Sequence, residues 1–106
     1  MPQLTVYYSA DLSLQPQELL AAVELCIAEH DETAGMCKSR AYPAEYYQHT
    51  SCYLQVRLLT KPHRDSLFMN QLLEKLTKMA RTFLPQHVHL AIDLDFSSKF
   101  YQTITT

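Results

Sequence analysis

Residues 51–59 read SCYLQVRLL, and this stretch decides the fold of the chain. Apolar and polar side chains alternate along it, and an alternation of period two indicates a strand with one buried face. Tyr53, Gln55 and Arg57 fall on the polar face of the predicted strand. The side chains of the predicted buried face are Cys52, Leu54, Val56 and Leu58.

Further strands are predicted on both sides of this stretch. Residues 3–9 (QLTVYYS) and 87–95 (HVHLAIDLD) alternate in the same way, and 36–42 (MCKSRAY) alternates more weakly. We expect a loop from 43 to 49. Residues 99–105 are expected to form a short edge strand or a tail that pairs with a neighbouring subunit.

Two amphipathic helices separate these strands. Apolar side chains recur at a spacing of three and four residues over about 16–31 and again over about 65–84. Gly35, the single glycine of the chain, suits a left-handed turn after the first helix. Pro85 is expected to end the second helix.

The resulting order, β-α-β-β-α-β, predicts a fold of the α+β class. Each helix is long enough to connect two parallel strands, and two such units form one four-stranded sheet with both helices on one face. A length of 106 residues predicts a single domain over residues 1–106. Ferredoxin-like regulatory or nucleic-acid-binding modules share this element order and are an alternative.

The composition narrows the possible functions. Nine Lys and Arg against eleven Asp and Glu give a net charge of −2, which argues against a nucleic-acid partner. A single glycine leaves no room for a glycine-rich phosphate loop. Because no apolar run reaches the roughly 18–20 residues that span a bilayer, no membrane segment is predicted. The start lacks a signal-peptide core and the cysteines are odd in number, so we expect a cytoplasmic protein with reduced thiols.

Pro2 is the first candidate catalytic residue. Removal of Met1 would leave a prolyl nitrogen, which is a secondary amine held by its ring. Cationic neighbours in a dry pocket would lower the pKa of this amine towards neutrality. The nitrogen could then take a proton from one atom of a substrate and return it to another.

Three cationic residues are candidates for binding an anionic substrate. Lys38 and Arg40 share one face of a predicted strand, and Arg64 lies just before the second predicted helix. Arginine can bind a carboxylate through two N–H groups, whereas lysine acts as a point charge. The alternative is that each residue simply occupies a solvated surface.

A metal site is not predicted. His87 and His89 are two residues apart, but no third histidine or cysteine pair follows at a zinc-binding spacing.

Several of these stretches together resemble a known family. The start PQLTVYYS, the strand K-S-R-A-Y, the segment H-R-D-S and the closing L-A-I-D-L-D…K-F-Y-Q are similar to those of 5-carboxymethyl-2-hydroxymuconate isomerase, in the tautomerase superfamily. The resemblance runs from Pro2 to about Gln102. It implies a tautomerase-like subunit, a homotrimer with active sites at subunit boundaries, no cofactor and an amino-terminal proline as acid and base. The family isomerises an unsaturated, hydroxylated dicarboxylate during the breakdown of aromatic acids.

The resemblance also assigns roles to individual residues. Pro2 matches the catalytic proline, and Arg64 matches an arginine that helps to bind the substrate. Where the family's strand reads R-S-R, this chain has Lys38, Ser39 and Arg40. The first arginine of the family's pair is tied to catalysis, and Lys38 stands at that position. A lysine keeps the positive charge but lacks the planar guanidinium group that binds a carboxylate through two N–H groups.

Two functions follow as hypotheses. One is an isomerase in which Pro2 moves a proton within an unsaturated 2-hydroxy or 2-oxo dicarboxylate, with Lys38, Arg40 and Arg64 holding the substrate. The other is a trimer of the same fold that binds a small ligand or a protein without turnover.

Overall fold

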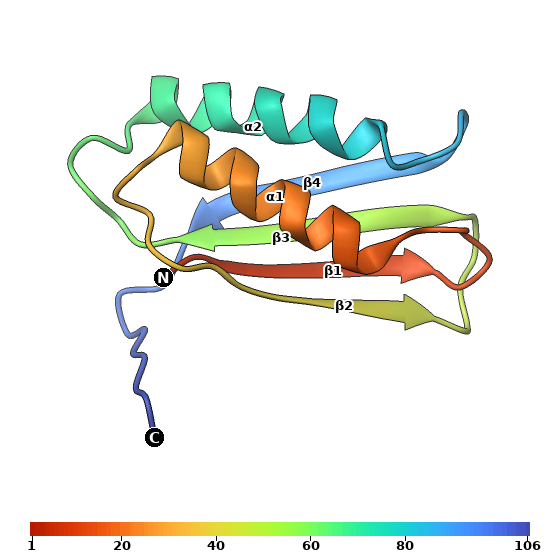
Figure 1. Ribbon diagram of the computed structural model, residues 1–106, viewed down its shortest axis with the longest axis horizontal. Helices are drawn as coiled ribbons and strands as arrows, with labels where there is room; N and C mark the ends of the chain where they lie inside the picture. Colours follow the sequence, from red (N-terminus) through yellow and green to blue (C-terminus); the bar gives the residue numbers. More distant parts are fainter.

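The computed structural model describes residues 1–106 and contains the six predicted elements in the predicted order (Figure 1). Four strands and two helices follow one another in the order β-α-β-β-α-β. They are β1 (Gln3–Ser9), α1 (Pro16–His30), β2 (Lys38–Ala44), β3 (Ser51–Leu58), α2 (Ser66–Arg81) and β4 (His89–Phe96).

The strands form one sheet in the order β2-β1-β3-β4. β1 and β2 are parallel, β3 and β4 are parallel, and the two pairs meet through the antiparallel neighbours β1 and β3. Each helix therefore connects two parallel strands that lie side by side. A split β-α-β unit would place another strand between them, so this topology excludes the ferredoxin-like alternative.

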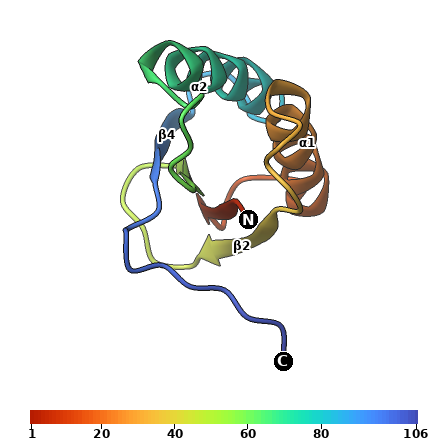
Figure 2. The same ribbon diagram turned by 90° about the vertical axis from the view of Figure 1, so that its left-hand side faces the viewer.

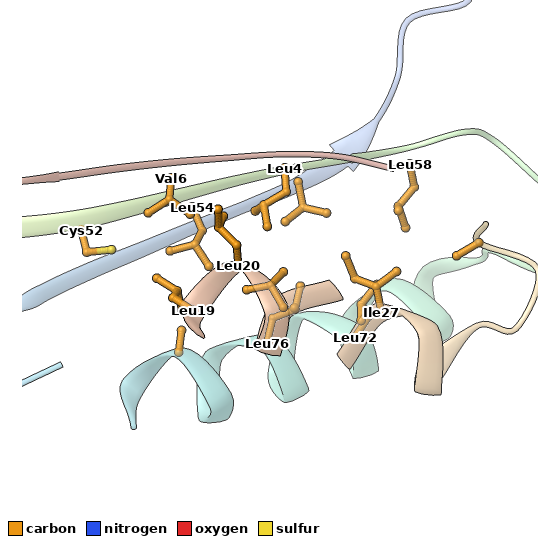
Figure 3. Close-up of a cluster of buried hydrophobic side chains, with 14 of the residues drawn as sticks. Leu4, Val6, Leu19, Leu20, Ile27, Cys52, Leu54, Leu58, Leu72 and Leu76 are labelled. Carbon is orange, nitrogen blue, oxygen red and sulfur yellow. The ribbon is translucent and has the colours of Figure 1, made fainter. Parts of the chain in front are cut away.

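Both helices cover the same face of the sheet, as predicted (Figures 1 and 2). Alternate side chains of the strands point towards the helices and pack against the apolar side chains of the helices. Together they form one apolar layer between the sheet and the helices. Figure 3 shows the two sets facing each other. The strands contribute Leu4, Val6, Cys52, Leu54 and Leu58, and the helices contribute Leu19, Leu20, Ile27, Leu72 and Leu76.

Several element boundaries differ from the sequence prediction. Helix α2 ends at Arg81 rather than at about residue 84, because the backbone N–H groups of Phe83 and Leu84 form turn hydrogen bonds before Pro85 is reached. β2 begins at Lys38 and continues through Pro43 to Ala44, whereas a loop was expected from residue 43. β2 is an edge strand, where a proline without an N–H group removes no hydrogen bond from the sheet. β4 begins at His89 rather than 87, because His87 has a positive φ of 68° that interrupts extended backbone.

The other face of the sheet is open and carries a row of tyrosines. Tyr7 stacks on Tyr42 of β2 with ring centroids 5.8 Å apart, and on Tyr53 of β3 at 6.2 Å. Tyr7 is 44% exposed and Tyr42 is 52% exposed. Large aromatic side chains on an uncovered sheet face are typical of a surface that binds another molecule.

The three cysteines are free thiols, as expected. Burial raises the pKa of Cys52 to about 11. Burial, followed by the nearby Glu24 carboxylate, raises the pKa of Cys37 to about 11. These two thiols stay protonated near neutral pH and are poor nucleophiles.

Neither helix is both long enough and apolar enough to cross a membrane. The C-terminal residues after β4 contain no helix or strand, so the short edge strand considered for 99–105 does not form within the chain.

Candidate active site

The amino terminus lies at the end of the sheet where two strands begin and two end. Gln3 of β1 pairs with Lys38 of β2 on one side and with Arg57 of β3 on the other, and Arg57 pairs with Asp95 of β4. The chain leaves β4 at this same end and continues as the C-terminal tail (Figure 1). Groups from the start, the middle and the end of the sequence therefore meet at the end of the sheet where Pro2 lies.

Pro2 is held rigidly at this position. Its side chain is fully buried, and its carbonyl oxygen accepts a hydrogen bond of 2.9 Å from the backbone N–H of Lys38. Its nitrogen carries Met1, whose side chain is 39% exposed. The first residue of the candidate site is thus fixed by β1–β2 pairing, independently of any ligand.

Lys38 and Arg40 lie on β2 opposite Gln3 and Thr5 of β1. The Lys38 side chain is exposed, and its closest polar partner is Met36 Sδ at 3.7 Å. Arg40 lies flat over β1: its Nη2 donates to Gln3 Oε1 at 2.6 Å and its Nη1 donates to Thr5 Oγ1 at 3.1 Å. Lys38 is the exposed cation of this pair, and Arg40 is held by hydrogen bonds to β1.

A hollow of about 590 Å³ opens at this end of the molecule. Met1, Gln3 and Lys38 line it together with the C-terminal residues 102–106. A second hollow of about 490 Å³ lies next to it and shares Gln3. Lys38 is the cationic side chain in the lining of the first hollow, and a cation there suits a small anionic ligand.

Tyr101 is a residue of this region to which the sequence analysis assigns no role. Its hydroxyl accepts a hydrogen bond from Gln3 Nε2 at 3.1 Å and lies 3.5 Å from the carbonyl oxygen of Met1. The separation from Met1 is 100 residues along the chain. No local pattern in the sequence links these residues, although Tyr101 belongs to the segment K-F-Y-Q that carries part of the family resemblance.

Arg64 has a different environment from the other two cations. Its side chain is only 2% exposed and its Nε donates to Asp31 Oδ2 at 2.8 Å. Its Nη1 donates to the carbonyl oxygen of Leu59 at 2.7 Å. Arg64 does not line the hollow beside Lys38 within this chain, and its role in substrate binding stays a prediction.

Asp31 is the centre of a buried polar cluster that holds Arg64. Its carboxylate accepts hydrogen bonds from the backbone N–H and hydroxyl of Thr33, from His63 and from Arg64. Burial alone would raise the pKa of Asp31, but the bonds from Thr33, His63 and Arg64 outweigh it and hold this pKa well below its usual range. The cluster therefore contains a permanent carboxylate that connects the end of α1 to the loop before α2.

The tyrosines of the loop after β2 lie away from Pro2. Ser9 at the end of β1 pairs with Ala44 at the end of β2, so Tyr46 and Tyr47 follow at the opposite end of the sheet. Tyr46 is 94% exposed. Within one chain these side chains do not line the hollow at the amino terminus. No group of three or more His, Cys, Asp or Glu side chains is placed to hold a metal ion.

Solved structures share the arrangement of strands and helices found in this chain. A crystal structure of a 5-carboxymethyl-2-hydroxymuconate delta-isomerase is similar with a TM-score of 0.72 and 21% identity, over 100% of this chain and 89% of that one. A 5-carboxymethyl-2-hydroxymuconate isomerase from Deinococcus radiodurans R1 is similar with a TM-score of 0.64 and 20% identity, over 98% of this chain and 88% of that one.

A probable enzyme from the thermophilic fungus Aspergillus fumigatus is similar at a TM-score of 0.65 and 14% identity, over 98% of this chain and 80% of that one. No known protein-family profile matches the chain, and no curated protein matches its sequence significantly. The likeness is therefore one of fold, and it confirms the tautomerase-like β-α-β-β-α-β architecture.

Proposed function

We propose that the chain is an isomerase of the tautomerase type, which moves a proton within an unsaturated 2-hydroxy or 2-oxo dicarboxylate. The observation that carries the proposal is the position of Pro2, which is buried just before the start of β1 and accepts a hydrogen bond through its carbonyl oxygen from the backbone N–H of Lys38. The fold shared with two 5-carboxymethyl-2-hydroxymuconate isomerases supports it. We place the reaction in the cytoplasmic breakdown of aromatic acids, with no cofactor.

The proposed reaction begins after Met1 has been removed. The Pro2 nitrogen takes the proton of the substrate's 2-hydroxyl group, and the electron pair moves through the conjugated system to a carbon. The protonated Pro2 then gives the same proton to that carbon, which leaves a 2-oxo product and a free amine. One proton moves and no electrons are lost, so the step needs no co-reactant.

The positive charges of the cationic side chains act on both the Pro2 nitrogen and the substrate in this step. A nearby positive charge disfavours a protonated amine, so the proposal requires Lys38 or Arg40 to act on the free Pro2 nitrogen. The same charges attract the substrate carboxylates and stabilise the negative charge that develops on the 2-oxygen. Lys38 is exposed and lines the same hollow as Met1, the residue before Pro2, which supports its contact with a bound carboxylate.

We further propose that three copies assemble into a homotrimer with the sites at subunit boundaries. The open sheet face with its exposed Tyr7 and Tyr42 supports an assembly that covers it. A native mass spectrum is expected to show a trimer, and a spectrum with monomer alone would contradict this part of the proposal.

The test of the function combines two measurements on the protein from its native host. The intact mass is expected to lack one methionine, which shows that Pro2 is the terminal residue. The same sample is expected to convert 2-hydroxymuconate to its 2-oxo isomer, followed by the loss of the dienol absorbance. A terminus that keeps Met1, with no turnover, would refute the isomerase and favour a trimeric binding module.

Removing the Lys38 charge is expected to weaken substrate binding. A hydrogen bond to a charged group contributes about 1.5–3 kcal/mol, so Lys38→Ala should raise the KM for 2-hydroxymuconate about tenfold or more. Lys38→Arg keeps the charge and should retain most of the affinity. Lys78→Ala removes an exposed lysine on α2 and is the matched control. Equal KM values for Lys38→Ala and Lys78→Ala would exclude Lys38 from the site.

A further inference from the structure

The side chains of Gln3 and Tyr101 connect Arg40 to the amino terminus through consecutive hydrogen bonds. Arg40 Nη2 donates to Gln3 Oε1 at 2.6 Å, and Gln3 Nε2 donates to the Tyr101 hydroxyl oxygen at 3.1 Å. The anchored guanidinium fixes which end of the Gln3 amide is the oxygen. The amide NH₂ group must then face the phenol.

This arrangement sets the direction in which the Tyr101 hydroxyl donates. The phenol oxygen already accepts a hydrogen bond from Gln3, so its own proton is available to a second acceptor. In this structure the acceptor is the carbonyl oxygen of Met1, at 3.5 Å, the outer limit of a hydrogen bond. Since that carbonyl is bonded to the Pro2 nitrogen, the hydroxyl lies within about 6 Å of the nitrogen by standard bond lengths.

Removal of Met1 takes away the carbonyl group that the phenol faces. The peptide carbonyl on the Pro2 nitrogen is chemically similar to the 2-oxo group of the proposed substrate, since each presents an sp² oxygen as a hydrogen-bond acceptor. A substrate whose reacting carbon approaches the Pro2 nitrogen would bring its 2-oxygen close to the region where the Met1 oxygen lies. The Tyr101 proton then points at the atom on which negative charge develops.

We infer that Tyr101 is a further catalytic residue of this site, which donates a hydrogen bond to the 2-oxygen of the substrate and stabilises the enolate. Gln3 is the positioning residue that orients the phenol. The inference rests on the proposed function and adds to it a neutral donor from the C-terminal segment. The step involves no transfer of the phenol proton, so Tyr101 ends the reaction as it began.

Two variants of Tyr101 and a control variant of Tyr46 test this role in the processed protein. Tyr101→Phe removes the hydroxyl and keeps the ring, and Tyr101→Leu removes both. Loss of one hydrogen-bond donor to a developing oxyanion lowers kcat by about 100-fold, so both variants should fall by this factor for 2-hydroxymuconate. Tyr46→Phe, at a 94% exposed position on the other end of the sheet, should leave kcat unchanged.

The comparison of the two Tyr101 variants shows whether Tyr101 acts as a hydrogen-bond donor or only as a packing residue. If the ring merely fills space, Tyr101→Phe should retain the wild-type kcat and Tyr101→Leu alone should lose it, which would overturn the inference. Thermal unfolding of Tyr101→Phe is expected to match wild type, because the residue lies in a segment without regular structure.

The experiment also distinguishes the inference from the proposed function. Wild-type protein that converts 2-hydroxymuconate while Tyr101→Phe keeps full activity would refute the role of Tyr101 and leave the isomerase standing. Wild-type protein with Pro2 exposed and no activity would refute the isomerase, and the inference with it.

Discussion

Replacing Pro2 by alanine is expected to lower kcat/KM for the ketonisation of 2-hydroxymuconate by about 10²–10⁴-fold, the usual contribution of a positioned acid and base. Alanine is also small, so Met1 should still be removed and the variant should begin with a primary amine. That amine lacks the ring that holds the Pro2 nitrogen in one orientation. The lower kcat/KM would therefore result from the changed position and basicity of the nitrogen, and not from a failure to remove Met1.

A second proline provides the matched control for this variant. Pro62 is exposed in the loop between β3 and α2, and Pro62→Ala should keep wild-type kinetics. The intact mass of each variant must be measured first, because only processed chains have a free terminus. Equal rates for Pro2→Ala and Pro62→Ala, both lacking Met1, would remove Pro2 from the mechanism.

Asp31→Asn is expected to destabilise the fold by about 3–5 kcal/mol, the cost of breaking a buried ion pair from one side. The Arg64 side chain is 2% exposed and the Asp31 side chain 4% exposed, so neither group can turn to water without opening the structure. An asparagine keeps the shape but leaves the buried guanidinium without a counter-charge. Chemical denaturation at neutral pH measures the loss.

The stability should also depend on pH through Asp31. Because the folded state lowers the pKa of this carboxyl, its contribution is fully present above the unfolded value of about 4 and is lost as the pH falls towards the folded value. Wild type should lose free energy of unfolding below about pH 4, and the difference from Asp31→Asn should shrink in the same range. A difference that stays constant down to pH 2 would show that Asp31 is not a charged partner of Arg64.

The controls for Asp31 use the other aspartate–arginine pair and a double variant. Asp93 pairs with Arg57 at 3.2 Å on the open face, where its side chain is 42% exposed, so Asp93→Asn should have a much smaller effect. Asp31→Leu combined with Arg64→Met removes both charges and should recover much of the loss. If Asp31→Asn is as mild as Asp93→Asn, the buried pair contributes little to the fold.

These variants also decide what Arg64 does. The resemblance assigns it to substrate binding, whereas its bonds to Asp31 and to the Leu59 carbonyl oxygen place it in a buried polar cluster. The double variant Asp31→Leu with Arg64→Met tests the role in substrate binding, because it removes Arg64 without leaving an unpaired aspartate in the core. A raised KM there, with an intact fold, would support direct binding.

The elements of this fold follow from periodic patterns within short stretches. The alternation in residues 51–59 and 3–9 predicts two strands and their buried faces, and the structure confirms both. The helical spacing of leucines predicts α1 and α2, and their lengths predict parallel connections over one face. The same alternation places Lys38 and Arg40 together on the open face, and both lie there next to β1.

Contacts between distant parts of the chain have no such pattern. Nothing near Arg64 in the sequence shows that it packs against Asp31, 33 residues earlier, and nothing near Tyr101 shows that it faces Met1 and Gln3. The continuation of β2 through Pro43 likewise depends on its place at the sheet edge. A side-chain period is a property of a few consecutive residues, whereas these partners meet only after the strands have paired and the helices have packed. Local chemistry therefore sets the elements and their faces, and the pairing of the sheet sets which groups surround the amino terminus.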